Sequence, residues 1–228
     1  MSGKEIAGGI KAVAFDAGGT LFEPWPSVGH IYAKAAAAHG VPGLRPEILT
    51  ERFVMAWRAR ASFGYARDEW AALVDATFEG LLEEPPSRTF FPALYEEFGG
   101  GRCWRVFEDV RPAIASLRKA GLRLAVISNW DERLRPLLAD LGFESDFDTV
   151  VVSGEEGAHK PSPEIFVTAA RRLGVAESAV LHIGDSPRED YEGARAAGCQ
   201  ALLLARGRRR EEGTIGSLME VAERLGIR

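Results

Sequence analysis

The chain has 228 residues, of which 46% are apolar and 27% are charged, the ordinary balance of a globular protein rather than a disordered or fibrous one. A formal net charge of −5 gives no support for a nucleic acid or an anionic membrane as a partner. The one local exception is the basic run at 206–210, and we interpret it as a solvated surface turn because two glutamates follow it directly.

The two cysteines, Cys103 and Cys199, lie in unrelated surroundings without metal-ligand spacing, so no disulfide framework is indicated. Residues 1–11 lack an apolar stretch long enough for a signal peptide, and no later stretch is continuous enough to span a bilayer. We therefore expect a cytoplasmic protein that does not bind membranes. Its oligomeric state, monomer or homodimer, is left open.

Five short apolar runs predict buried strands. The first, Ile10 to Asp16, contains valine and phenylalanine and stops at Gly18-Gly19. The others cover 122–128, 149–153, 179–184 and 200–204. From about residue 109 onward, amphipathic helical stretches alternate with these runs, such as those ending at Gly121 and Gly174 and the one over 187–197. The alternation predicts an α/β fold, a doubly wound parallel sheet with helices on both faces.

Residues between the first and second strands break this alternation. They predict helices at 28–39, 45–62, 68–83 and 89–98, separated by loops with proline and glycine. Because loops at the carboxyl ends of strands carry the ligand site of an open parallel sheet, a domain inserted here can act as a lid. We thus expect an α/β core domain at 1–21 and 108–228 and a smaller all-helical cap domain at 22–107.

Polar side chains follow several of the predicted strands. Asp16 ends the first, Ser128 closes the second, Lys160 lies in a loop beyond the third, and Asp185 and Asp190 follow the fourth. Each has an ordinary explanation alone, as a loop former, a helix cap or a surface lysine. Their joint placement at one rim of the sheet is better explained by a functional site.

The charges of these residues indicate a metal. Three neighbouring carboxylates raise one another's pKa and repel a phosphate unless cations are supplied. Lys160 together with one Mg²⁺ supplies three positive charges against three aspartates. Mg²⁺ takes oxygen ligands from one or two carboxylates, water and substrate phosphate, a need that Asp16 and Asp185 meet.

These segments resemble the four ordered motifs of the haloacid dehalogenase-like hydrolase superfamily, whose phosphatases form an aspartyl-phosphate. The matching segments are 16–21, Ser128-Asn129, Lys160-Pro161 and 184–190. The helical stretch also resembles the cap that the superfamily inserts between its first and second motifs, so the resemblance covers nearly the whole chain. Through 127–131 and the Asp-x-x-Gly-Thr-Leu opening, the chain is most similar to the rhythmically-expressed-gene-type branch.

The resemblance implies catalytic roles. Asp16 would attack phosphorus as the nucleophile, because a carboxylate forms a labile acyl phosphate. Thr20 would support the loop of the first motif. Ser128 and the backbone amide of Asn129 would hydrogen-bond a phosphoryl oxygen, while Lys160 would neutralise charge on the transferred group.

The resemblance also implies a metal site and a substrate class. Asp16, Asp185 and the backbone carbonyl of Gly18 would bind Mg²⁺ as the cofactor. Asp190 would orient Lys160 or a metal-bound water. The expected partner is a small phosphorylated molecule, whose identity the sequence does not reveal.

One motif position departs from the pattern. In most phosphatases of the superfamily, the residue two after the nucleophile is an aspartate that protonates the leaving oxygen and later activates water; here it is Gly18. Positioned acid–base catalysis is worth about 10²–10⁴-fold, so we expect slow turnover, a preference for good leaving groups, and a gain on poor ones from Gly18→Asp. The alternative is a binding or regulatory protein that holds Mg²⁺ and phosphate without turnover.

Two other branches of the superfamily also lack this acid. Haloacid dehalogenases do not keep the acidic fourth motif present here at Asp185 and Asp190, which argues against dehalogenation. Phosphonate-cleaving members use a cap lysine, and the one lysine in 22–107 is Lys34, which we interpret as a solvated helical residue.

Aromatic and histidine side chains carry weaker signals. We expect Trp57, Phe63 and Trp70 to pack the cap helices together. Phe22 and Trp25 are better candidates for lining an entrance. The four histidines are too scattered in the sequence for a metal site (His30, His39, His159 and His182).

Overall fold

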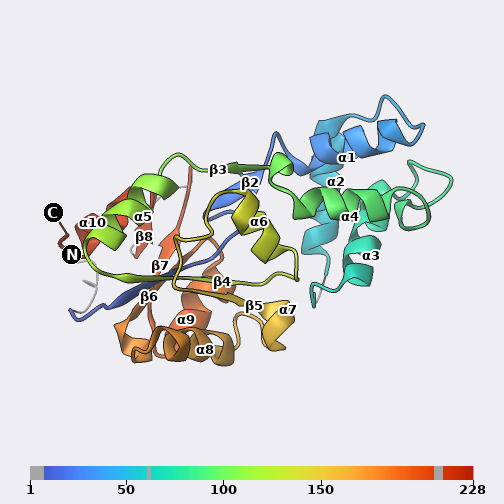
Figure 1. Ribbon diagram of the computed structural model, residues 1–228. Helices are drawn as coiled ribbons and strands as arrows, with labels where there is room; N and C mark the ends of the chain where they lie inside the picture. Colours follow the sequence, from blue (N-terminus) through green and yellow to red (C-terminus); the bar gives the residue numbers. More distant parts are fainter. Residues whose placement is uncertain (1–7, 61–62, 208–212, 228) are drawn as a thin grey trace. The chain divides into compact units, whose positions relative to one another are not determined.

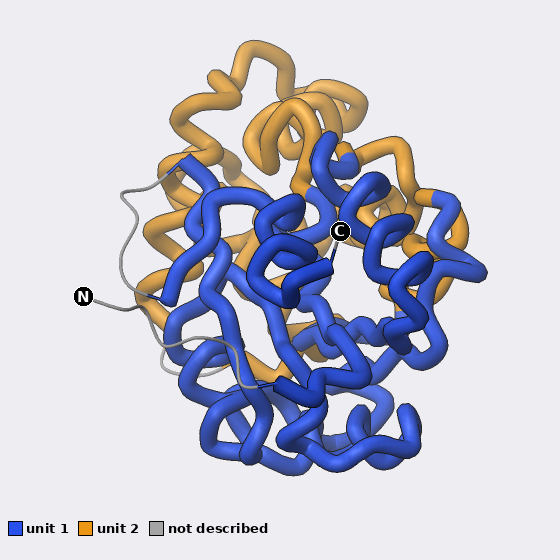
Figure 2. Tube along the Cα trace, turned by 90° about the vertical axis from the view of Figure 1, so that its left-hand side faces the viewer, with its two compact units in different colours: residues 1–22, 106–132, 142–228 blue, residues 23–105, 133–141 orange. Residues whose placement is uncertain are grey.

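The computed structural model describes residues 8–60, 63–207 and 213–227. The expectations for 1–7, for the helix end at residue 62 and for the basic run beyond residue 207 lie outside the described residues. Among the described residues, none of the helices combines the length and the apolarity needed to cross a bilayer. The chain divides into two compact units: unit 1 holds 1–22, 106–132 and 142–228, and unit 2 holds 23–105 and 133–141 (Figure 2).

Unit 1 is built on a six-stranded parallel sheet with the order β5-β4-β1-β6-β7-β8 (Figure 1). The strands are β1 (Ala12–Phe15), β4 (Arg123–Ser128), β5 (Thr149–Val152), β6 (Val180–Gly184), β7 (Gln200–Leu204) and β8 (Thr214–Ile215). The five predicted strands are present, each within two residues of its expected limits. Side chains of β1 and β6 are buried on both faces of the sheet, which is why these strands appear in the sequence as apolar runs. The doubly wound α/β fold is confirmed.

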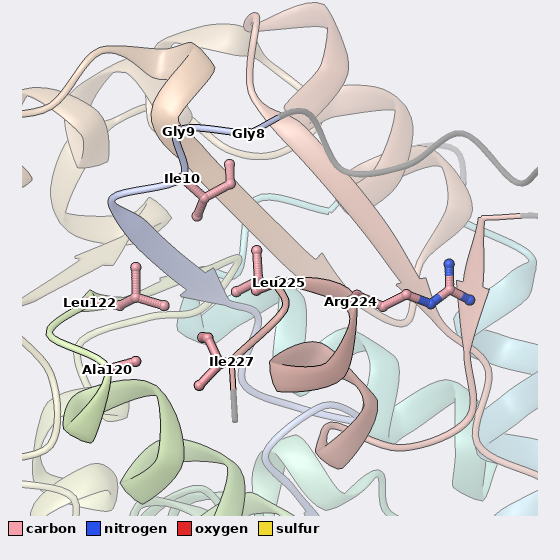
Figure 3. Close-up of a pocket in the computed structure, with 8 residues that line it drawn as sticks. All are labelled: Gly8, Gly9, Ile10, Ala120, Leu122, Arg224, Leu225 and Ile227. Carbon is pink, nitrogen blue, oxygen red and sulfur yellow. The ribbon is translucent and has the colours of Figure 1, made fainter.

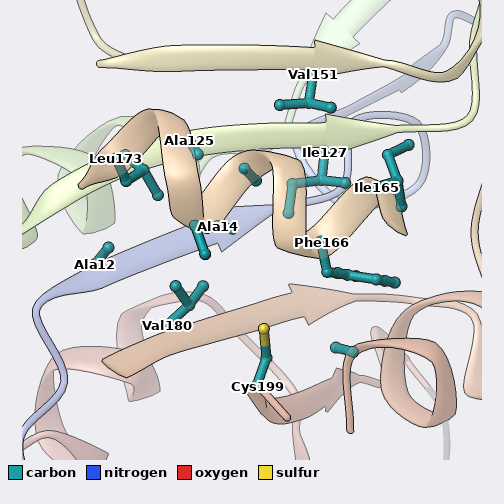
Figure 4. Close-up of a cluster of buried hydrophobic side chains, with 13 residues drawn as sticks. Ala12, Ala14, Ala125, Ile127, Val151, Ile165, Phe166, Leu173, Val180 and Cys199 are labelled. Carbon is teal, nitrogen blue, oxygen red and sulfur yellow. The ribbon is translucent and has the colours of Figure 1, made fainter. Parts of the chain in front are cut away.

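Helices cover both faces of this sheet. They are α5 (Val110–Lys119), α7 (Ser153–Glu156), α8 (Pro163–Leu173), α9 (Gly193–Ala196) and α10 (Met219–Arg224). Figure 1 shows α5 and α10 on one face and α8 and α9 on the other. Small side chains on β1 let α8 pack closely: Ala12 and Ala14 share a buried cluster with Phe166 of α8 and Val180 of β6 (Figure 4). The helix expected at 187–197 is in fact a π-helix, η4 (Pro187–Glu192), followed by α9.

Unit 2 is helical. It contains α1 (Val28–Ala38), α2 (Pro46–Arg58), α3 (Arg67–Phe78), η1 (Pro86–Arg88), α4 (Phe91–Gly99), η2 (Gly101–Cys103) and α6 (Leu134–Asp140). Residues 133–141 group with unit 2 because α6 packs against α4 and η2, whereas the sequence-based division put them in the core domain. A small sheet of β2 (Phe22–Pro24) and β3 (Trp104–Val106), which the sequence analysis did not predict, joins the two ends of the inserted segment.

The aromatic side chains of unit 2 pack on one another. Trp57 stacks on Trp70 with ring centroids 5.9 Å apart, and Phe63 meets Trp70 edge-on at 4.8 Å. Trp25 is 45% exposed, and the guanidinium of Arg105 lies 3.3 Å from the centre of its ring. Cap packing therefore accounts for Trp57, Phe63 and Trp70.

Candidate active site

Three neighbouring strands deliver polar groups to one edge of the sheet in unit 1. β1 pairs with β4 and β6 so that Phe15 lies opposite Val126 and Ile183. Asp16 directly follows β1, Ser128 ends β4, and Asp185 directly follows β6. Because the strands are parallel and in register, their carboxyl ends meet at the same edge.

Lys160 is the centre of this site. Its side chain is 1% exposed, and its ammonium donates to Oδ1 of Asp16 and to Oδ1 of Asp190, each at 2.6 Å. The hydroxyl of Ser128 donates to the same Oδ1 of Asp16 at 3.0 Å. The structure thus brings together four residues that are separated by up to 174 positions in the chain, Asp16, Ser128, Lys160 and Asp190.

Asn129 fixes the loop that carries Lys160. Its side-chain amide donates to the carbonyl oxygen of Lys160 at 2.9 Å and accepts from the amide of Lys160 at 2.7 Å. Two bonds of opposite direction between one side chain and one backbone unit define both position and orientation. In this structure, then, the side chain of Asn129 holds the lysine loop.

Asp190 is held by three donors. Besides Lys160, His182 bonds to Oδ1 through Nε2 at 3.0 Å, and the amide of Ser186 donates to Oδ2 at 3.0 Å. A carboxylate only accepts, so Nε2 of His182 carries the proton in this contact. His182 lies in β6 with no exposed surface, and its role was missed because the histidines were judged only by their separation in the sequence.

The pKa shifts follow from burial and from Lys160. Burial raises the pKa of Asp16, and Lys160 offsets only part of that rise. Burial alone would also raise the pKa of Asp190, but Lys160 and His182 hold it well below its usual value. The two carboxylates raise the pKa of Lys160 against the effect of its burial, so the lysine stays charged.

Three carboxylates gather beside this lysine. Asp16, Asp185 and Asp190 each offer an oxygen, and these oxygens lie within 4.8 Å of one another. With one ammonium, three carboxylates leave two negative charges, and the donors are all hard oxygens. This set fits a divalent cation of the Mg²⁺ type.

The loop after Asp16 passes close to Asp185. Gly19 has φ +79°, and a Cβ there would lie 2.6 Å from Oδ2 of Asp185. Thr20 is fully buried, and its hydroxyl has no hydrogen-bond partner among the described residues. Its carbonyl accepts from Arg206 at 2.9 Å, a contact that ties the first-motif loop to the end of β7.

Glu189 is a further acidic neighbour that the sequence analysis missed. Burial raises the pKa of Glu189, Lys160 lowers it, and Asp190 and Asp16 raise it again. Its half-buried side chain extends from η4, directly before Asp190. The signal available in the sequence was its position next to Asp190 in the fourth motif.

Other features lie away from these residues. A pocket of about 280 Å³, lined by residues that include Ile10, Leu122 and Leu225, lies at the opposite, amino-terminal edge of the sheet (Figure 3). None of the predicted site residues lines it. In unit 2, the side chain of Lys34 is 76% exposed and pairs with Glu97 at 2.8 Å, as a solvated lysine does.

Comparison with known proteins identifies relatives that cover most of the chain. Residues 10–198 match the haloacid dehalogenase-like hydrolase family. The chain is 35% identical to haloacid dehalogenase-like hydrolase domain-containing protein 3 of Mus musculus, over 86% of this chain and 82% of the relative. It is 30% identical to a phosphoserine phosphatase of Thermus thermophilus, over 84% and 71% of the two chains.

Solved structures agree with this assignment. A phosphatase of the same superfamily from Thermococcus onnurineus aligns with a TM-score of 0.70 and 26% identity, over 96% of this chain and 99% of that one. A 2-haloacid dehalogenase from Pseudomonas syringae aligns with a TM-score of 0.65 and 26% identity, over 95% and 98%. Since both activities occur on this fold, the site residues must distinguish them.

Proposed function

Because the chain belongs to the haloacid dehalogenase-like hydrolase family, we propose that it is a magnesium-dependent phosphatase of small phosphate esters with Asp16 as the nucleophile. The observation that carries this proposal is the buried ammonium of Lys160, 2.6 Å from both Asp16 and Asp190. A cation beside the nucleophile offsets the negative charge of an incoming phosphoryl group. The relatedness to a phosphoserine phosphatase supports the same class.

In the proposed reaction, Asp16 attacks phosphorus, the bond from phosphorus to the leaving oxygen breaks, and water then hydrolyses the aspartyl-phosphate. Ser128 and Lys160 both bond to Oδ1 of Asp16, so we assign the attack to its other carboxylate oxygen. Ser128 and the backbone amide of Asn129 would then bind a phosphoryl oxygen. Asp190 is a positioning residue that acts through Lys160.

The carboxylate cluster supports a bound Mg²⁺. Asp16, Asp185 and the backbone carbonyl of Gly18 would hold the ion, which supplies positive charge for the phosphate oxygens when it is bound. The retained Asp185 and Asp190 support phosphate chemistry over dehalogenation, because a halide displacement from carbon has no dianionic group for a cation to neutralise.

A second candidate function has a specific observation in its favour. Gly18 carries no acid, and Trp130 lies against it, so the usual proton transfer at that position is lost. A binding or regulatory protein would retain Mg²⁺ and phosphate affinity without turnover. We rank it second because Lys160 and its partners preserve the charge arrangement of a working site.

Phosphate release from a panel of phosphorylated metabolites and aryl phosphates, with and without Mg²⁺, tests the proposal. We expect Mg²⁺-dependent release that Asp16→Asn abolishes. Asp68→Asn, at an exposed position in unit 2, is the matched control for the loss of a carboxylate charge. Mg²⁺-dependent binding of a phosphate mimic without release from any compound would instead support the binding protein.

A further inference from the structure

Gly18 lies beside an aromatic side chain. Its φ is not among the positive values of the chain, whereas Gly19 has φ +79°. A Cβ built on Gly18 would lie 3.0 Å from Cζ3 and 3.7 Å from Cη2 of Trp130. Ordinary carbon–carbon contacts lie at about 3.5–4.0 Å. The indole ring of Trp130 therefore borders the position from which any side chain at residue 18 would have to start.

Hydrogen bonds fix the backbone of Trp130, and its ring packs against Phe22. The backbone amide of Trp130 donates to the hydroxyl of Ser153 at 3.0 Å, and its carbonyl accepts from that hydroxyl at 3.1 Å and from the amide of Gly154 at 2.9 Å. The ring meets Phe22 edge-on, with centroids 6.0 Å apart. Phe22 is fully buried, so it supports the tryptophan rather than standing open at an entrance.

The position of the ring changes the chemistry beside the nucleophile. Gly18 is two residues after Asp16, and the carbon edge of an indole has no proton to donate to a leaving oxygen. A Cβ introduced at residue 18 would press on the ring, so an aspartate there requires the ring to shift by a few tenths of an ångström. We therefore expect the ring to limit the gain that Gly18→Asp alone provides.

We propose that Gly18 and Trp130 together keep an acid out of this position and so restrict the enzyme to phosphoryl compounds whose leaving group departs without a proton, namely aryl and acyl phosphates. This proposal rests on the phosphatase function proposed above. Trp130 contributes by bordering the point from which any side chain at residue 18 would extend. Alkyl phosphates, whose leaving oxygen must be protonated, are then poor substrates.

The activity test compares wild type with Gly18→Asp, Trp130→Ala and the double variant on a series of aryl phosphates and one alkyl phosphate. We expect Gly18→Asp alone to gain no more than about 2-fold on the alkyl phosphate. The activity of the double variant on the alkyl phosphate should rise at least about 10-fold, somewhat below the usual range for general acid catalysis. Across the aryl phosphates, its activity should depend less on the pKa of the leaving group. A single Gly18→Asp variant that gains as much as the double variant would overturn the proposal.

A stability test is independent of turnover. Gly18→Ala should lower Tm by about 2–8 °C when Trp130 is present, because overpacking costs stability, and by clearly less in a Trp130→Ala background. Trp130→Leu, which removes the ring but keeps apolar volume, serves if the alanine variant does not fold. An equal loss in both backgrounds refutes the contact. If wild type releases phosphate from none of the compounds, the phosphatase function is refuted. The comparison of Tm values still tests whether Trp130 lies against residue 18.

Discussion

Lys160 is an ammonium that the fold buries almost completely. Such a charge is tolerated only when hydrogen bonds and opposite charges compensate its lost hydration. Asp16 and Asp190 provide both, and each bond is 2.6 Å long. Removing the lysine would therefore leave two buried carboxylates without the ammonium that compensates their charge.

Lys160→Met should destabilise the protein at neutral pH by about 3–5 kcal/mol, the usual cost of breaking a buried pair. Lys160 and His182 hold the pKa of Asp190 low against the effect of burial. In wild type, this stabilisation is present above the ordinary pKa of an aspartate and is lost as pH falls through the lowered pKa. In the variant the carboxylates no longer have the ammonium beside them, so their pKa values rise. The loss of stability relative to wild type should therefore be smaller at pH 5 than at pH 7.5.

Urea unfolding at pH 7.5 and pH 5 measures this difference. Lys119→Met, at an exposed position on α5, is the control and should change stability by no more than about 0.5 kcal/mol. A Lys160→Met protein as stable as wild type at both pH values would contradict the assigned role of the lysine.

The two cysteines give a prediction of low reactivity. Burial raises the pKa of Cys103 to about 11 and that of Cys199 to about 12. The reactive thiolate is then a minor species at pH 8. In the folded protein, alkylation by iodoacetamide at pH 8 should be at least about 10-fold slower than for a free thiol, and it should become fast in 6 M urea. Rapid labelling of the folded protein, located by mass spectrometry, would show that one of these thiols is accessible.

At the scale of elements, β6 and η4 together position Asp190, because His182 on the strand bonds to Asp190 on the π-helix at 3.0 Å. We expect His182→Leu to lower kcat about 10-fold with little change in KM, since Asp190 loses a donor that positions it. His182→Gln, which keeps a donor at a similar place, should stay within about 3-fold of wild type. Equal losses in both variants would indicate a packing role.

The sequence predicted elements that local patterns define. Strands buried on both faces stand out as apolar runs, and the order of polar residues after them predicted one shared edge. The β2–β3 pair was missed because each partner is three residues long and 79 residues lie between them. η4 and α9 were taken as one helix, because the apolar period does not distinguish a π-helical turn from an α-helical one.

The sequence also predicted part of the candidate site. Motif spacing singled out Asp16, Lys160 and Asp190, whose contacts the structure provides. The relation of Trp130 to Gly18 was not predictable, because it depends on how a loop after β4 packs on a loop after β1. Contacts between separate loops depend on side-chain packing, which carries no local pattern.

At the scale of the whole molecule, the cluster of three carboxylates costs free energy that a bound cation would offset. Mg²⁺ at 100 times its Kd should stabilise the protein by about 2.7 kcal/mol, which corresponds to a Tm increase of about 5–10 °C for a chain of this size. Asp185→Asn should remove at least half of that increase. Asp68→Asn, exposed in unit 2, should retain it, and a Tm that does not respond to Mg²⁺ in wild type would argue against the metal site.

The central claim is that Asp16 takes up a phosphoryl group. The most direct test is acid quenching of the protein with an aryl phosphate and Mg²⁺, followed by mass spectrometry of its peptides. We predict one added phosphoryl group on the peptide that contains Asp16, accumulating because no acid at residue 18 activates water for its hydrolysis, and none in Asp16→Asn. Turnover of the aryl phosphate with no adduct on Asp16, or with an adduct on another residue, would contradict the account.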